Sequence, residues 1–264
     1  MAIADLLLLS LIAGSGAGLL AGLIGIGGGI VIVPAIYFGL IHSGFPPDQA
    51  AHVAVSTSLA TILPAAITSS IAHWRAGNTD LEFLRRWGPG IVLGVTVAQF
   101  VAPYVRGSFL IAMFACFCLL TAVRFAMPEK FKPIFPQPPS GIGRNGAGVA
   151  IGLVSGFAGV GGGIMTNIVM TVSGMSMHKS IGRAAACGVL VGLPATIVAA
   201  LGPLPDHAMQ LGSINIPLWA CIAPVQAMAA WFGAQLAQRT SATALSRIFA
   251  ASLAATGVTM LSTL

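Results

Sequence analysis

The stretch GSGAGLLAGLIGIGGGI (residues 14–30) returns later in the chain as GVAIGLVSGFAGVGGGI (residues 148–164). Both copies lie inside long apolar segments, and their glycines coincide at one fixed offset. Such an internal repeat predicts two structurally related halves. The coincident pairs are Gly14/Gly148, Gly18/Gly152, Gly22/Gly156, Gly25/Gly159, Gly27/Gly161, Gly28/Gly162 and Gly29/Gly163.

The composition is that of a protein embedded in a bilayer. Of the 264 residues, 56% are hydrophobic and only 7% are charged, against roughly 25% charged residues in an average soluble domain. The first apolar stretch has no basic n-region before it, so we interpret it as part of the mature protein. The sequence predicts a multipass membrane protein, with the net charge of +6 in its loops rather than on a nucleic-acid-binding surface.

The two glycine segments, residues 6–41 and 146–175, are too long for a single crossing. A bilayer core of ~30 Å needs about 20 helical residues, and the glycine triplet in the middle of each segment weakens a helix. Each is therefore predicted to be a helix hairpin or a pair of half-helices. The other apolar segments fit one crossing each, at residues 50–74, 87–104, 108–126, 180–202, 214–238 and 244–263.

The basic residues of the loops predict the topology. The positive-inside rule places the linker at residues 127–145 and the loop near Lys179 on the same side, so the glycine segment between them must return to the side it left. We therefore predict an all-α polytopic membrane protein of two inverted repeats, each a glycine-broken helix hairpin plus three transmembrane helices, with both termini outside. Its parts are an N-terminal repeat (1–126), a Pro-rich cytoplasmic linker (127–145) and a C-terminal repeat (146–264).

The glycine triplets are candidates for substrate binding. A dinucleotide-binding loop is excluded, because the final glycine, the preceding strand and the acidic partner are missing. Glycines at a break expose backbone N–H groups, and a half-helix N-terminus adds partial positive charge. Two inverted hairpins would bring two such termini together near the midplane, where they could hold a small oxyanion; close helix packing is the alternative. The residues are Gly27, Gly28, Gly29, Gly161, Gly162 and Gly163.

Polar side chains in apolar runs are further candidates. Ser56, Thr57 and Ser58 follow the first hairpin and could donate hydrogen bonds to the anion, or bond back to carbonyls of their own helix. Asn167 is a candidate donor from the second half, with core hydrogen bonding as the alternative. The stretch RAAACG (183–188) has no hydroxyls at the equivalent place, which predicts an asymmetric site.

Two ionisable residues lie near helix starts. His52 titrates near neutrality and could couple protons or attract an anion, although a satisfied polar contact would also explain it. Arg183 could attract an anion or extend to the membrane interface. The four cysteines have no metal-ligand spacing, and no catalytic constellation lies within the apolar segments. We therefore predict no metal, no cofactor and no enzymatic activity.

Four stretches resemble the TauE/SafE family of sulfite and organosulfonate exporters, and the resemblance covers nearly the whole chain. The resemblance implies an inner-membrane protein that moves small sulfur oxyanions such as sulfite or organosulfonates. The stretches are GLIGIGGGIVIVP (22–34), AVSTSLATI (54–62), HWRAGN (73–78) and GFAGVGGGI (156–164).

Residues and resemblance together predict a secondary transporter, an exporter of small sulfur-containing oxyanions, with proton coupling as an option. Two other classes stay open: a passive small-anion channel, and a membrane sensor or structural subunit that does not transport. The expected partners are the anion and the lipid bilayer, not nucleic acid, and a homo-oligomer is compatible with the sequence.

Overall fold

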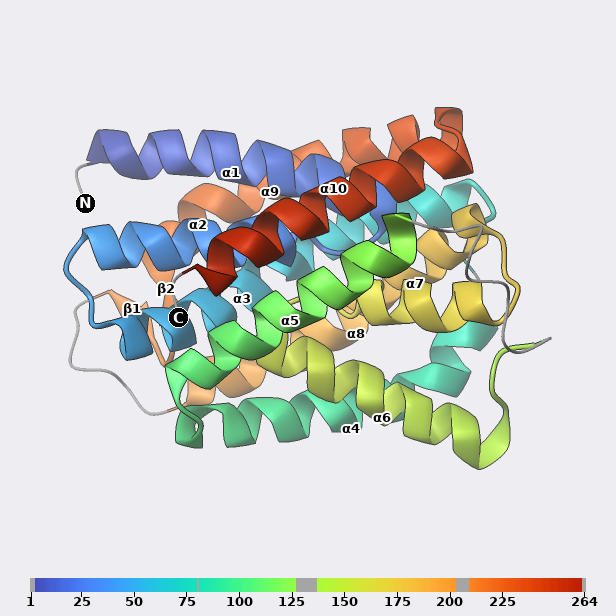
Figure 1. Cartoon of the computed structure of the whole chain (residues 1–264), viewed down its shortest axis with the longest axis horizontal. Helices are drawn as coiled ribbons and strands as arrows, with labels where there is room; N and C mark the ends of the chain where they lie inside the picture. The colour runs from blue at the N-terminus through green and yellow to red at the C-terminus, as the bar shows by residue number, and fades with distance from the viewer. Residues whose placement is uncertain (1–2, 80, 127–136, 203–208, 263–264) are drawn as a thin grey trace.

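The structure is a computed structural model that describes residues 3–79, 81–126, 137–202 and 209–262. It is almost entirely helical, as predicted for an all-α membrane protein (Figure 1). The first half consists of α1 (Ile3–Ile24), α2 (Gly29–His42), α3 (Pro47–Arg75), α4 (Leu81–Val101), the 3-10 helix η1 (Ala102–Tyr104) and α5 (Gly107–Ala126). The second half consists of α6 (Gly141–Ala158), α7 (Gly163–Val172), α8 (Met177–Leu201), the strands β1 (Gln210–Leu211) and β2 (Ile214–Asn215), α9 (Ile216–Arg239) and α10 (Ala242–Leu261).

The helices break at the glycine triplets, as the sequence predicts. Gly28 precedes α2 with φ 81° and Gly162 precedes α7 with φ 74°, values that glycine adopts without steric cost. Figure 1 shows α2 running back toward the end where α1 begins, and α7 running back toward the opposite end, where α6 begins. Each glycine segment is thus a helix hairpin. Residues 127–136 of the predicted linker lie outside the described residues, and α6 begins at Gly141, ahead of the predicted start of the repeat.

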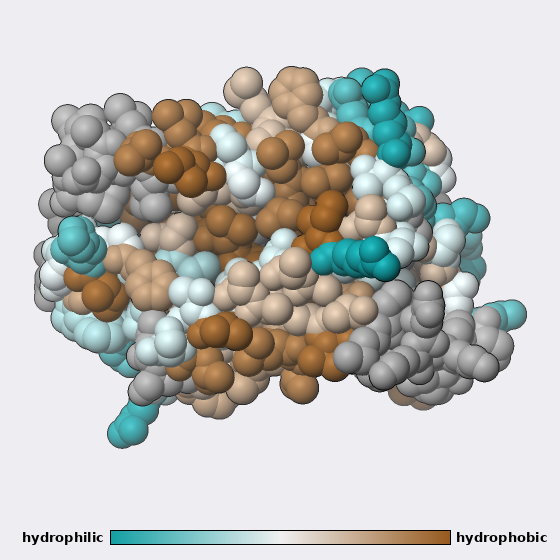
Figure 2. Space-filling model, turned by 45° about the horizontal axis from the view of Figure 1, so that its top comes forward, coloured by the Kyte–Doolittle hydropathy of each residue, from teal (hydrophilic) through white to brown (hydrophobic). Residues whose placement is uncertain are grey.

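The described helices include 5 that are long and apolar enough to cross a membrane: α3, α5, α8, α9 and α10. These are five of the predicted single crossings. The remaining one, α4, carries Glu82, Arg85 and Arg86 in its first turns. Figure 2 shows apolar residues spread over the middle of one face and hydrophilic residues gathered toward its ends. The chain is therefore a multipass membrane protein.

The two halves interlock. Helix α1 packs along α9, and its counterpart α6 packs along α4. Helix α3 lies against α8, and α5 against α10. Equivalent helices thus have equivalent partners. That the two halves are inverted repeats stays a prediction. In Figure 1, α1 begins and α10 ends near one end of the molecule, while α5 ends and α6 begins near the other. Which end faces the cytoplasm stays a prediction.

Small residues permit the closest helix approaches. If Gly18 carried a Cβ atom, that atom would lie 2.3 Å from the carbonyl oxygen of Gln226. A Cβ added to Gly22 would lie 2.1 Å from the carbonyl oxygen of Ala230. In the equivalent contact, a Cβ on Gly152 would lie 2.2 Å from the carbonyl oxygen of Ile91. Gly18 and Gly22 stand four residues apart, and Gly152 belongs to the matching series in the second half, a spacing that predicts close helix packing. The contacts confirm this prediction, because no side chain fits between the helices.

Candidate functional site

The two glycine breaks cross in direct backbone contact at the centre of the molecule. A Cβ on Gly29 would lie 2.5 Å from the carbonyl oxygen of Gly159, and one on Gly163 would lie 2.0 Å from that of Gly25. All six triplet glycines are buried. The structure therefore brings the triplets of the two halves together, in a close packing of backbone on backbone.

Buried amides brace this crossing. Gln226 donates from Nε2 to the carbonyl oxygen of Gly27 at 2.7 Å. Asn167 donates from Nδ2 to the carbonyl oxygen of Ile24 at 2.9 Å, and its Oδ1 accepts from the hydroxyl of Ser180 at 2.7 Å. Asn167 thus makes core hydrogen bonds, the alternative that its sequence position predicted. These bonds join the second hairpin to the first.

The three consecutive hydroxyls of α3 have three different surroundings. Ser58 donates to the carbonyl oxygen of Gly159 at 3.0 Å, so it holds the second glycine break. Thr57 accepts from the backbone N–H of Asn215 at 3.0 Å, which fixes the start of α9. Ser56 lines a cavity. Of the three, Ser56 is the one placed to meet a solute in this conformation.

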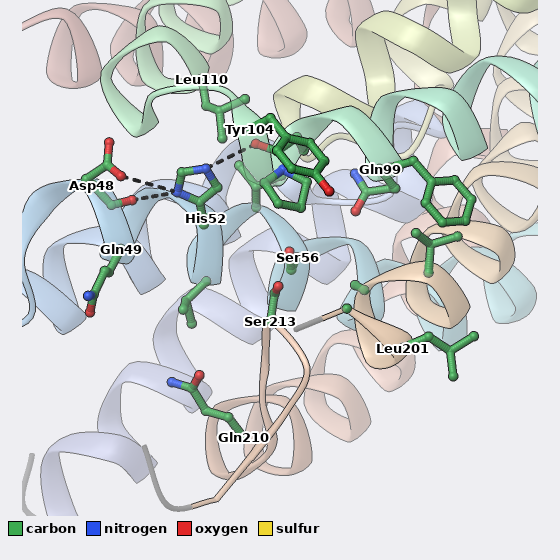
Figure 3. A pocket seen from close by; sticks show the side chains of 18 of the residues that line it. Asp48, Gln49, His52, Ser56, Gln99, Tyr104, Leu110, Leu201, Gln210 and Ser213 are labelled. Carbon is green, nitrogen blue, oxygen red and sulfur yellow. Dashed lines mark hydrogen bonds and ion pairs between the residues drawn. The ribbon is translucent and has the colours of Figure 1, made fainter. Parts of the chain in front are cut away.

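The cavity has a volume of about 820 Å³ and opens between the start of α3, the end of α4 with η1, and the end of α8 with the β-hairpin (Figure 3). Its wall reaches the glycine crossing: Val55 lines the cavity, and its Cα would lie 3.1 Å from a Cβ on Gly159. The triplets themselves are not part of the wall. The polar residues that line it are Asp48, Gln49, His52, Ser56, Gln99, Tyr104, Gln210 and Ser213.

The lining offers more hydrogen-bond donors than negative charge. Hydroxyls, amides, a phenol and an imidazole can all donate. Asp48 is the one carboxylate among the described lining residues, and its Oδ1 accepts from the backbone N–H of Gly107 at 2.5 Å. Among the described residues, no group of three or more His, Cys, Asp and Glu side chains could hold a metal ion.

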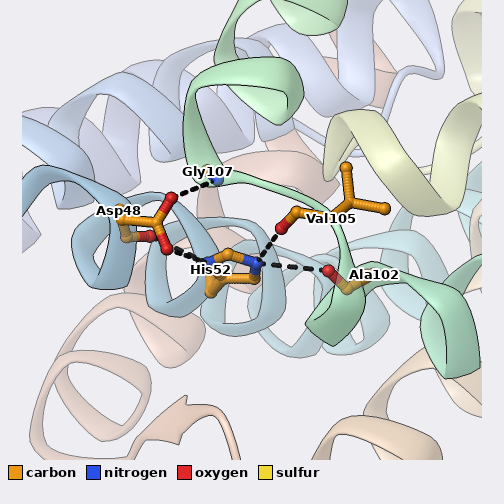
Figure 4. Close-up of polar contacts among 5 residues, drawn as sticks. All are labelled: Asp48, His52, Ala102, Val105 and Gly107. Carbon is orange, nitrogen blue, oxygen red and sulfur yellow. Dashed lines mark hydrogen bonds and ion pairs between the residues drawn. The ribbon is translucent and has the colours of Figure 1, made fainter.

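His52 joins the start of α3 to the connection between α4 and α5 (Figure 4). Its Nδ1 lies 2.8 Å from the carbonyl oxygen of Asp48. Its Nε2 lies 2.9 Å from the carbonyl oxygen of Val105 and 3.2 Å from that of Ala102. The ring also lines the cavity, so it combines a satisfied polar contact with access to a solute.

Arg183 lies far from His52. Its guanidinium carbon is 4.9 Å from the centre of the Phe83 ring, and Nη1 is 3.9 Å from the sulfur of Met170. Phe83 is in the first turn of α4, whereas His52 contacts the residues just after its last turn. The two ionisable candidates therefore do not share one site.

A second hollow lies apart from the cavity and shares none of its described lining residues. This hollow has a volume of about 230 Å³ and lies between the end of α3, the start of α4 and the middle of α8. Buried apolar side chains of α3, α4 and α8 form a cluster, to which α6 and α7 also contribute. Its members include Leu59, Ile62, Ile91 and Val191.

Sequence reasoning missed several lining residues. Gln99 is buried and donates from Nε2 to the carbonyl oxygen of Gly156 at 2.9 Å. Its position inside the apolar run GVTVAQF (94–100) was a signal, since an amide in such a run needs a partner. Gln210 and Ser213 come from a polar loop, where no local pattern marks a cavity.

Comparison with known proteins agrees with this architecture. The model of the family described as sulfite exporter TauE/SafE matches residues 10–260. A probable membrane transporter protein of Haemophilus influenzae is 30% identical over 259 residues, which cover 96% of this chain and 97% of that protein. One of Methanocaldococcus jannaschii is 26% identical over 225 residues, covering 81% and 79%. One of Bacillus subtilis is 31% identical over 186 residues, covering 62% and 65%. The chain belongs to the sulfite exporter TauE/SafE family.

Proposed function

We propose that this protein is a secondary transporter that exports small sulfur-containing oxyanions such as sulfite or organosulfonates. The observation that carries the proposal is a donor-lined cavity whose wall reaches the glycine crossing through Val55. The family and the membrane transporters among its relatives support transport rather than catalysis.

The lining suits an anion. Moving a charge out of water costs several kcal/mol unless donors replace its hydration. Ser56, Gln99 and Tyr104 can supply such donors, and neither Lys nor Arg is among the lining residues that the structure describes. An anion held without a lysine or an arginine can leave again, which transport requires. The volume of about 820 Å³ leaves room for an organic group on the sulfonate.

The glycine triplets have a place in the proposed cycle. Ser56 faces the cavity, and Ser58, two residues on, holds the second break. If the crossing opens during transport, the N-termini of α2 and α7 meet the end of the cavity. Their backbone N–H groups and partial positive charge then favour an anion. The triplets would thus contribute in a state other than this one.

A passive channel and a sensor would each require something different of the structure. A passive channel needs a continuous polar path, whereas Leu59, Ile62 and Ile91 are fully buried in the apolar cluster. This arrangement favours a transporter that opens one side at a time. A sensor would bind the anion without moving it, which only a flux measurement distinguishes.

The test is uptake of labelled sulfite, an organosulfonate and sulfate into proteoliposomes, with and without a pH gradient. We expect saturable uptake of sulfite or the sulfonate. Ser56→Phe should block it by filling the cavity, while Thr259→Phe, at an exposed position of α10, should not. Uptake that does not saturate would indicate a channel. Calorimetric binding without uptake would indicate a sensor.

A further inference from the structure

The ring of His52 faces hydrogen-bond acceptors with both of its nitrogens. The oxygen atoms around it, from Asp48, Ala102 and Val105, are backbone carbonyls, which accept and never donate. A neutral imidazole has one N–H, and an imidazolium has two. The neutral ring would therefore place one lone pair against a carbonyl oxygen, whereas the imidazolium satisfies both sides.

We infer that His52 is a proton-binding residue of the transport cycle. Its protonated ring donates hydrogen bonds to carbonyl oxygens of α3 and of the α4–α5 connection, a link that we call the clasp. The same ring places positive charge on the cavity wall. The inference rests on the proposed function, since it assigns the coupling ion and its site to that transporter.

The charged and titratable surroundings are compatible with a cation. Asp48 Oδ2, from the same helix, lies 3.9 Å from Nδ1 of His52. From η1, Tyr104 lines the same cavity, and Arg106 follows Val105 in the connection and is exposed. The lining residues that α4 and α8 contribute are uncharged. The Asp48 carboxylate is thus the charge that lies beside the ring, and its sign is opposite to that of an imidazolium.

The clasp links protonation of His52 to the position of the cavity wall. Ala102 and Tyr104 are part of the cavity wall, so loss of the Nε2 hydrogen bond frees the segment that forms it. Ser56 lies one helical turn beyond His52 on the same face of α3, so an anion beside Ser56 also meets the imidazolium. Proton and anion should therefore strengthen each other's binding, and this coupling is reciprocal.

The direct test is nitrogen NMR of histidine-labelled protein in detergent. His42, exposed at the end of α2, is the internal reference. At the pH where His42 is half deprotonated, we expect His52 to keep protons on both nitrogens, and added sulfite to extend that range. A single neutral tautomer of His52 at this pH would overturn the inference, whatever the transport assays show.

The functional test compares His52→Gln with His42→Gln in proteoliposomes. We expect His52→Gln to lose the pH dependence of sulfite uptake and to transport about tenfold less at acid pH, a factor within the usual range of coupling between two ligands. His42→Gln should keep the wild-type profile. An unchanged profile in His52→Gln would overturn the inference while leaving the transporter intact.

A second variant covers the case in which His52→Gln does not fold. Asp48→Asn keeps an oxygen for the N–H of Gly107 but removes the negative charge beside the ring. Its uptake should have a pH midpoint shifted to lower pH, and an unshifted midpoint would contradict the clasp. If wild-type protein transports neither anion, the proposed function fails, and the NMR measurement alone decides the proton site.

Discussion

The amide of Gln226, in α9, donates a hydrogen bond of 2.7 Å to the carbonyl oxygen of Gly27, in the glycine break of the other half. Gln226 is fully buried, and a Cβ on Gly28 would lie 2.7 Å from the same amide nitrogen. The break of the first half is thus completed by a helix of the second. Neither hairpin has all its partners within its own repeat, so the two halves depend on each other for folding.

This bond predicts a cost for Gln226→Leu. The variant leaves the carbonyl of Gly27 buried without that partner, which destabilises a protein by about 1–3 kcal/mol. Denaturant unfolding in detergent should show the loss. Gln235→Leu, at an exposed position of the same helix, is the control and should unfold like the wild type. Equal stability of the two variants would show that the bond contributes little.

Helix packing predicts opposite results at two glycines of α1. Gly18→Val should prevent folding or assembly, because its Cβ would meet the Gln226 carbonyl oxygen at 2.3 Å. Gly16→Val is the matched control, since nothing lies within 4 Å of a Cβ there. Size-exclusion profiles and protein yield measure the difference. A normal yield of folded Gly18→Val protein would mean that α1 can move away from α9.

The second triplet allows a finer comparison. A Cβ on Gly163 would lie 2.0 Å from the backbone oxygen of Gly25, so Gly163→Ala should disrupt the crossing and abolish transport. A Cβ on Gly162 would meet a side-chain methyl of Val191 at 2.9 Å, although its φ of 74° adds strain. Gly162→Ala should fold better than Gly163→Ala, as thermal unfolding would show. Gly162→Val and Gly28→Val should lose transport, and wild-type flux in both would remove the triplets from the site.

The sequence was sufficient to locate the helix breaks. Three adjacent glycines disfavour a helix by their own backbone entropy, and this local effect needs no knowledge of the rest of the chain. The same holds for Gly18 and Gly152, whose spacing along one helix face predicts a close neighbour. Local patterns thus gave the hairpins and the tight helix contacts.

The cavity could not be predicted in the same way. Its wall takes residues from α3, η1, α8 and the β-hairpin, and no local pattern reports on such distant partners. The three hydroxyls illustrate this: Ser56, Thr57 and Ser58 are consecutive, yet only their tertiary partners separate a cavity residue from two structural ones. Asn167 likewise needed the position of Ile24 before its role could be stated.

The membrane orientation is testable with single cysteines on a background that lacks Cys116, Cys118, Cys187 and Cys221. Ser43→Cys lies in the α2–α3 connection and Ala76→Cys follows α3; both positions are exposed. The loop charges place position 43 outside and position 76 inside. An impermeant thiol reagent added to intact cells should therefore label only the first. Labelling of position 76 alone would reverse the predicted orientation.

The last prediction separates binding from structure at two neighbouring hydroxyls. Ser56→Ala removes a donor from the cavity wall and should weaken sulfite or sulfonate binding by about 1–2 kcal/mol if the hydroxyl donates to a charged ligand. Its stability should be unchanged, because no partner among the described residues loses a bond. Ser58→Ala instead removes the hydrogen bond to Gly159 and should lower the unfolding temperature. Calorimetric titration of both variants, combined with thermal unfolding, measures the two effects on the same samples.

Unchanged anion affinity in Ser56→Ala would exclude that hydroxyl as a ligand. Tight binding of an organic cation to the wild type would contradict an anion site altogether, since the lining donors repel positive charge.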